Sequence, residues 1–275
     1  MSEKKQAIRL DFLINASYSI KPVIHTFILE LRLQFKKFLL FLSLTFVFLF
    51  LMSFINFFFN QLPHSLLLYY EILTDYLFMI IIFAVSVLFG GIICSEYKSK
   101  TGLVVLPLIN KNKLILGKYL ANAILVSGII CVFYLSLTLF AYYFYGGPIL
   151  NTILFSFGLA ILYTLALASI AVFLSSFLPS IIPVIIIMVG YILTWDSYLS
   201  QFFAVSTGEL EPLYSFSYLF EIVKQIFYPN FSTMARYNEY QGWLFPSIEG
   251  ALILLSFYMI LFFILSILLF KHRQF

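Results

Sequence analysis

The sequence predicts an all-α, polytopic integral membrane protein with six transmembrane helices. Of its 275 residues, 63% are hydrophobic and only 10% are charged, and the mean hydropathy is +1.03. A soluble domain is about 45–50% apolar and about 25% charged. Inside a bilayer, only helices and closed barrels satisfy their own backbone hydrogen bonds. The long apolar runs of this chain lack the alternating polarity of barrel strands, so we expect a helical bundle.

Residues 1–37 form a predicted cytosolic N-terminus that ends in an amphipathic helix. After Pro22 the chain reads PVIHTFILELRLQFKK, in which apolar residues recur at helical spacing. Such a helix lies in the membrane interface with its lysines toward the headgroups. The alternative interpretation is a cytosolic extension of the first span. The apolar side of the predicted helix consists of Ile24, Phe27, Ile28, Leu31 and Phe35.

Six apolar runs within residues 38–275 are candidate membrane spans. Insertion scales favour each central Leu, Ile, Phe or Val by about 0.3–0.6 kcal/mol, whereas a central charge costs about 3 kcal/mol. No run carries a charge in its middle. Pro179, Pro183 and Gly190 interrupt the fifth run, so a kinked or partly re-entrant segment is an alternative there. The predicted spans are Phe38–Phe59, Leu77–Cys94, Tyr119–Leu139, Ile149–Leu174, Ile181–Trp195 and Ala251–Phe270.

The distribution of Lys and Arg predicts the orientation of these spans. Seven of the 16 basic residues precede the first span, five lie between the second and third spans, and two follow the last. Only Lys224 and Arg236 fall on the other side of a six-span arrangement. Because basic loops stay in the cytosol, we expect both termini to be cytosolic and the chain to be a multi-pass protein of the cell membrane. The net charge of +4 reflects this topology and does not indicate a nucleic-acid partner.

The longest predicted loop, residues 196–249, lies outside the cytosol and contains a predicted helix. Its sequence LEPLYSFSYLFEIVKQIFYP carries apolar residues on more than one face. We therefore expect a short helix pressed on the outer mouth of the bundle. A gating role and a simple capping role are both open. The residues that would form such a gate are Leu213, Phe216, Phe220, Val223 and Phe227.

The segment Ser95–Lys118 combines five lysines with an apolar insert, Leu103–Ile109. As a helix the insert covers about 10 Å, roughly a third of a bilayer core, so it cannot span. Three interpretations are open for it. The lysines serve only topology, the insert forms a membrane-surface helix, or it docks as a short helix in a groove of a cytosolic partner. The first interpretation leaves the insert unexplained.

Motifs of catalysis and cofactor binding are missing from the sequence. Gly117-Lys118 is followed by Tyr119, and Asn112 occupies the position of the first glycine, so there is no Walker A motif. The sequence contains no HExxH, no GxSxG and no metal-ligand spacing of its two cysteines. The spans also lack the charged residues of proton relays. We expect a chain that is not an enzyme and binds no cofactor or metal itself.

The arrangement of Ser95–Lys118 resembles that of the permease subunit of type-2 ATP-binding cassette exporters. In that family a second span runs into the cytosol as a charged stretch, followed by a Gly–Thr-like turn, a leucine-rich segment, a proline and a basic start of the third span. Here the corresponding features are Glu96 to Lys100, Thr101-Gly102, Leu103 to Leu108 with Pro107, and Leu116-Gly117-Lys118. The Thr-Gly order and the single preceding acid depart from the commoner pattern. The resemblance extends over nearly the whole chain, including the amphipathic "elbow" helix.

The resemblance implies a division of labour between subunits. A separate cytosolic ATPase would bind ATP and Mg, and a second permease chain, identical or paralogous, would complete the path across the bilayer. The alternatives from other classes are a membrane scaffold or sensor that recruits a cytosolic partner, and an ion-coupled secondary carrier. The coupling residues that the resemblance implies are Glu96, Lys98, Lys100, Thr101, Gly102, Leu103, Val104, Leu106, Pro107, Lys111 and Lys113.

Overall fold

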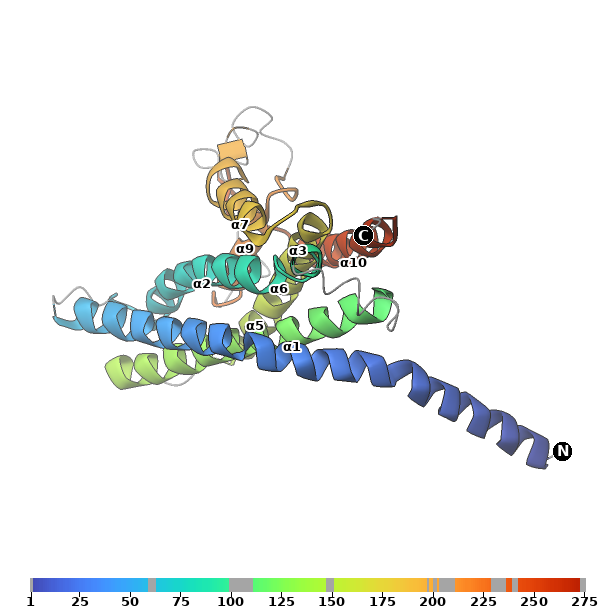
Figure 1. The fold of residues 1–275 in the computed structure, drawn as a ribbon. Helices are drawn as coiled ribbons and strands as arrows, with labels where there is room; N and C mark the ends of the chain where they lie inside the picture. The colour runs from blue at the N-terminus through green and yellow to red at the C-terminus, as the bar shows by residue number, and fades with distance from the viewer. Residues whose placement is uncertain are drawn as a thin grey trace.

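In the computed structural model, the described part of the chain is helical apart from one pair of two-residue strands (Figure 1). The class predicted from the sequence, an all-α polytopic membrane protein, is confirmed. The structure describes residues 2–58, 63–98, 111–146, 151–196, 198–199, 202, 211–228, 236–238 and 242–272, and of residues 2–20 it describes the backbone alone.

Five helices of the described chain are long and apolar enough to cross a membrane. A further apolar helix is shorter. It consists of the ten residues of α7 (Ile181–Gly190) and the six residues of the π-helix η1 (Tyr191–Asp196), whereas a span needs about 20 residues. The five long helices are α1 (Ser2–Phe58), α2 (Leu66–Phe89), α5 (Lys111–Tyr145), α6 (Thr152–Phe177) and α10 (Ile248–His272).

Helix α1 contains both the predicted interfacial helix and the predicted first span. It is continuous through the predicted boundary at Lys37 and Phe38, because no glycine or proline follows Pro22 to end it. Within residues 24–35, the side that packs on the bundle differs from the predicted apolar side. Thr26 and Glu30 are buried instead. Of the predicted apolar residues, Ile24, Ile28 and Phe35 are exposed, Phe27 is half-buried and Leu31 packs on the core.

Helix α2 begins eleven residues before the predicted start at Leu77. The Ser65 hydroxyl accepts a hydrogen bond from the Leu68 amide at 3.3 Å and caps the first turn. The carboxylates Glu71 and Asp75, which precede the predicted second span, therefore lie on the early turns of the helix. After Phe89 the chain turns through residues 90–93 and continues as the short helix α3 (Cys94–Lys98).

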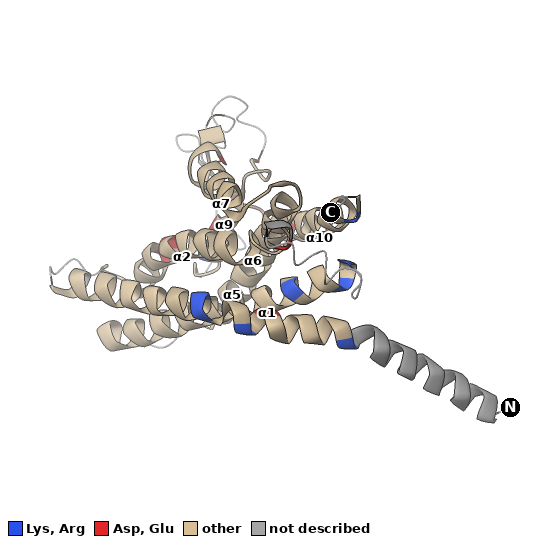
Figure 2. Ribbon diagram, in the orientation of Figure 1, with Lys and Arg blue, Asp and Glu red and all other residues tan. Residues whose placement is uncertain are grey.

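The five long helices run in two opposite directions, so the bundle has two distinct ends. Helices α2, α6 and α10 all finish at the end where α5 begins. Helices α1 and α5 run the same way, since Thr26 lies against Gly117 and Phe38 against Gly128. A Cβ at Gly117 would lie only 2.8 Å from the Thr26 Cβ, so this glycine permits the close approach of the two helices. We call the end that contains these first turns of α5 the Lys118 end. In Figure 2 most of the described basic residues lie along the middle of α1, at the start of α5 and at the end of α10.

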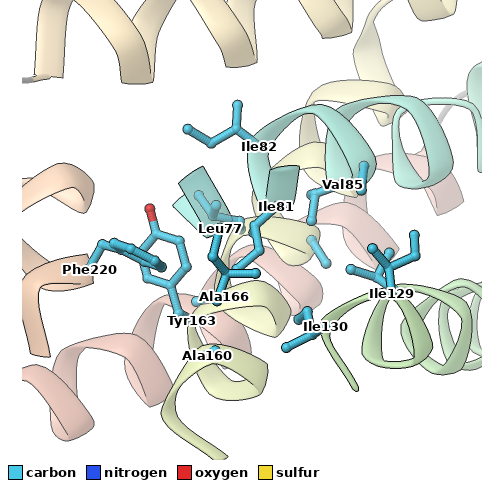
Figure 3. Close-up of a cluster of buried hydrophobic side chains, with 14 of the residues drawn as sticks. Leu77, Ile81, Ile82, Val85, Ile129, Ile130, Ala160, Tyr163, Ala166 and Phe220 are labelled. Carbon is cyan, nitrogen blue, oxygen red and sulfur yellow. The ribbon is translucent and has the colours of Figure 1, made fainter. Parts of the chain in front are cut away.

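The opposite end carries the short helix α9 (Phe216–Gln225), and we call it the α9 end. Helix α2 crosses α1 in the reverse direction, with Ser53 bonded to Tyr69 near this end. The strands β1 (Tyr237–Asn238) and β2 (Gly242–Trp243) pair antiparallel before α10 begins. The core between the ends is formed by side chains of α2, α5, α6 and α9 (Figure 3), including Leu77, Ile81, Ile130, Ala166 and Phe220.

Candidate functional site

The predicted coupling segment is described only at its two ends. Lys100, Thr101, Gly102, Leu103, Val104, Leu106 and Pro107 lie outside the described residues, and of Lys98 the backbone alone is described. The two described ends are α3, which contains Glu96, and the first turns of α5. The structure therefore locates the base of this segment on the bundle.

A buried ion-pair cluster joins the two ends of the segment. The Lys118 ammonium of α5 contacts the Glu96 carboxylate of α3, and it lies 3.7 Å from the Glu30 carboxylate of α1. The three side chains are only 10%, 12% and 6% exposed. Gln34 donates a hydrogen bond to Glu30 at 2.7 Å. We call Glu30, Glu96 and Lys118 the Lys118 cluster, and it ties three helices together where the coupling segment leaves the bundle.

Two further contacts fasten this end of the bundle. The Ser175 hydroxyl of α6 accepts hydrogen bonds from the amides of Ile93 and Cys94, at 3.1 and 3.0 Å. These amides belong to the turn between α2 and α3, where helix geometry leaves donors unpaired. The Lys111 ammonium lies 3.4 Å from the Phe270 carbonyl near the end of α10. A cation at a helix C-terminus is also favourable for the helix dipole.

The sequence indicated only part of this cluster. Glu96 and Lys111 were predicted coupling residues, and both lie at the Lys118 end. Lys118 was placed at the basic start of the third span, and Glu30 lay in the predicted amphipathic helix without a role of its own. The missing signal was three-dimensional, because Glu30 is 88 residues from Lys118 and only the packing of α1 on α5 brings them together. Lys113 is half-buried and has no ion pair among the described residues.

At the other end, α9 is an integral part of the core. Phe216, Phe220, Val223 and Phe227 are buried, at 7%, 2%, 0% and 3% exposure. The Phe220 ring lies 5.1 Å from the Tyr163 ring of α6 and 4.9 Å from the Phe78 ring of α2. Four of the five predicted gate residues are therefore buried against the bundle.

The aromatic contacts of α9 extend over several helices. Phe216 contacts the Tyr258 ring of α10 at 5.1 Å, and Phe227 stacks on Tyr70 of α2 at 5.3 Å. Leu213, the fifth predicted gate residue, is half-buried and lies beside Gly250 at the start of α10. Rings paired at these distances contribute about 0.5–1.5 kcal/mol each beyond their burial. The helix thus covers the α9 end of α2, α6 and α10.

Polar contacts fix the first turn and the middle of α9. The Asp196 carboxylate at the end of η1 accepts hydrogen bonds from the Ser217 amide at 2.6 Å and the Ser215 hydroxyl at 2.9 Å. A carboxylate in this position satisfies orphan donors and complements the positive end of the helix. Farther along, the Ser156 hydroxyl of α6 donates to the Val223 carbonyl at 2.8 Å. These contacts connect α9 to η1 and α6.

A lysine-centred clasp holds the last turn of α9. The Lys224 ammonium lies 2.7 Å from the Asp75 carboxylate of α2 and 2.6 Å from the Glu221 carboxylate of α9. One turn of α2 away, the Tyr228 hydroxyl donates to Glu71 at 2.6 Å. Burial raises the pKa of Glu221, and Lys224 offsets part of that rise. Burial alone would lower the pKa of Lys224, but its two carboxylate partners outweigh burial and raise it.

Among the buried side-chain atoms that have no hydrogen-bond partner in the described part of the chain, those of Asn122 and Tyr163 belong to fully buried residues of the long helices. The amide nitrogen and oxygen of Asn122 are both unpaired, although its side chain is fully buried one helical turn after Lys118. The Tyr163 hydroxyl is also unpaired beneath α9. A buried polar group without a partner costs about 1–3 kcal/mol. Each of these two polar groups therefore lowers the stability of the bundle relative to an apolar group of the same shape.

The described residues contain no group of three His, Cys, Asp or Glu residues that could hold a metal ion. The ion pairs at the two ends of the bundle connect short helices to long ones. Lys118 links α3 to α5, and Lys224 links α9 to α2. In the comparisons, the chain matches no protein-family model and no curated protein.

Proposed function

We propose that this chain is the membrane-spanning permease subunit of an ATP-binding cassette exporter. A separate cytosolic ATPase binds ATP and Mg, and two permease chains, identical or paralogous, form the translocation path. The observation that carries the proposal is the Lys118 cluster. A docking segment transmits force to a bundle only when its two ends are fixed to the helices, and Glu96 and Lys118 bind each other at those ends.

In this proposal the chain crosses the cell membrane six times. The short helix formed by α7 and η1 is the fifth span, and local thinning of the bilayer accommodates its length. The Lys118 end and both termini are cytosolic. Of the 16 basic residues, 14 lie before the first span, between the second and third spans or after the last span, all on one side of a six-span chain. This distribution supports the orientation.

The helix α9 is the outer gate in this proposal. It contacts α2, α6, α10 and η1, so a movement of these helices at the Lys118 end changes the surface on which α9 packs. Closure of the ATPase pair pulls on the coupling segment, shifts the helices that meet at the Lys118 cluster and loosens α9. This is a two-state coupling between sites at opposite ends of the bundle.

Affinity purification tests the docking part of the proposal. The tagged full-length chain, extracted from its native membrane in a mild detergent, should co-purify with an ATPase that carries a Walker A motif. Replacing Leu103, Val104 and Leu106 by Asp places charges on the apolar insert, and this variant should lose the ATPase while still inserting in the membrane.

A matched control adds the same charge to the same loop outside the insert. The variant with Ser95→Asp, Ser99→Asp and Asn110→Asp should retain the ATPase. Unchanged recovery with the Leu103, Val104 and Leu106 variant would refute docking through the insert. Recovery of a signalling protein in place of an ATPase would favour the scaffold or sensor function, and ATP-independent flux in vesicles would favour a secondary carrier.

A further inference from the structure

An apolar groove runs along the outer surface of the bundle between α1 and α2. Its volume is about 610 Å³ and its lining presents no polar surface. The wall residues Leu40, Leu44, Met79 and Phe83 are 60%, 59%, 44% and 43% exposed, so the groove opens to the surroundings of the bundle. The full lining is Leu40, Phe41, Leu44, Thr45, Phe48, Tyr76, Met79, Ile80 and Phe83.

The groove has a closed and an open end. At the α9 side the Phe48 and Tyr76 rings meet edge to face at 5.0 Å. The Thr45 hydroxyl donates to the Phe41 carbonyl at 2.7 Å, so it offers no polar group to the groove. From Phe48 back to Leu40, α1 rises by about 12 Å. The open end of the groove therefore points toward the Lys118 end of the bundle.

Two lysines stand at this open end. Lys36 lies four residues before Leu40 and Lys37 four residues before Phe41, so each projects from the same face of α1 as a wall residue. Both are exposed, and neither has an ion pair within the described part of the chain. The preceding acid on α1, Glu30, is turned toward Lys118 and Gln34. The mouth of the groove thus carries two unneutralised positive charges.

We propose that the groove with Lys36 and Lys37 binds one anionic phospholipid. The headgroup phosphate pairs with the two lysines, and one acyl chain lies in the groove from Leu40 to Phe48. The charge pattern selects this occupant. A neutral helix of another chain would leave both lysines unpaired, and a soluble phosphate would leave the groove empty. The site is independent of any ATPase partner and of the transported substrate.

Native mass spectrometry of the purified full-length chain tests the proposal, with phosphatidylglycerol and phosphatidylcholine of identical acyl chains as the two probes. Wild-type protein should retain one phosphatidylglycerol in preference to phosphatidylcholine. Lys36→Gln with Lys37→Gln should weaken phosphatidylglycerol binding by roughly thirtyfold and remove the preference. Leu44→Trp fills the groove from an exposed wall position and should weaken binding of both lipids.

The control Lys113→Gln with Lys271→Gln removes the same charge at the same end, away from the groove, and should leave binding at the wild-type level. Equal loss in this control would overturn the site in favour of general surface charge. Displacement of the lipid by glycerol phosphate alone would show that the groove has no role. If Leu44→Trp left lipid binding intact but separated a dimer, the groove would be a contact between copies and the proposal would be wrong.

Discussion

Lys118 has an unusual position for a residue at the start of an apolar helix, because it faces two carboxylates and not the headgroups. A buried ion pair repays its desolvation only with good geometry and further hydrogen bonds. Here Glu96 contacts the ammonium directly, Glu30 lies 3.7 Å away, and the Ile92 carbonyl lies 3.5 Å away. The cluster is therefore specific for this packing of α1, α3 and α5, and its main contribution is to fix their relative positions.

Removal of the central cation should be far more costly than removal of one acid. Lys118→Met leaves two buried carboxylates without a counter-ion, and we expect it to lower the free energy of unfolding by about 3–5 kcal/mol. Glu96→Gln leaves Lys118 with Glu30 and should cost less. Denaturant unfolding in detergent measures both. Lys113→Met is the control, and an equal loss there would contradict a specific role for the cluster.

Asn122 offers a second test at the scale of a residue. Both atoms of its amide are buried without a partner among the described residues, so Asn122→Leu should raise the free energy of unfolding by about 1–3 kcal/mol. The comparison is Thr164→Val, which removes a hydroxyl bonded to the Ala160 carbonyl at 2.7 Å and should not stabilise. Thermal unfolding in detergent distinguishes them. A destabilised Asn122→Leu protein would show that the amide has a structural partner.

At the scale of elements, α9 is held at its two ends by contacts of different strength. Asp196→Ala removes the carboxylate that accepts from the Ser217 amide beside the N-cap Ser215, and it should cost about 1–2 kcal/mol. Asp75→Ala removes a carboxylate that is 59% exposed, so it should cost less than about 1 kcal/mol. Hydrogen exchange of the amides of residues 216–225 reports the difference. Equal exchange in the two variants would mean that the Asp196 carboxylate does not stabilise α9.

The last turn of α9 should respond to pH through Glu221. Burial raises the pKa of this carboxyl above its ordinary value of 4.5. The folded protein then holds the proton more tightly than the unfolded chain, so the stability from Glu221 is present at low pH and is lost as pH rises through the raised pKa. Unfolding of wild type and Glu221→Gln should diverge in that range. Glu249→Gln, which replaces an exposed carboxyl at the same end, is the control for the loss of one acidic side chain.

The elements show which features were predictable from the sequence. Apolar runs predicted the long helices, because burial in lipid needs only composition and length. Their limits were less predictable. Glu71 and Asp75 precede the predicted start at Leu77, yet Ser65 caps a helix that includes both. The side of α1 that packs on the other helices was not predicted. In a membrane bundle the packed face can be polar, since apolar side chains such as Ile24 and Ile28 are stable toward lipid.

At the scale of the whole molecule, the clusters around Lys118 and Lys224 lie at opposite ends of the same helix, α2 with its extension α3. Lys118 binds Glu96 of α3, and Lys224 binds Asp75 on the early turns of α2. A rigid displacement of this element therefore alters both clusters together. The sequence could not indicate this connection, because the pairs Lys118–Glu96 and Lys224–Asp75 join residues that are 22 and 149 positions apart along the chain.

The membrane topology depends on whether α7 and η1 cross the bilayer, and it can be measured. Six crossings place Lys271 in the cytosol and Tyr237 outside, whereas a re-entrant α7 would place Tyr237 inside and Lys271 outside. We expect Lys271→Cys, in a chain with Cys94→Ser and Cys131→Ser, to react with an impermeant maleimide only after permeabilisation of the cells, and Tyr237→Cys to react in intact cells. The reverse pattern would refute six crossings. It would also remove α9 from the outer face, because α9 and Tyr237 follow η1 without another helix of spanning length among the described residues.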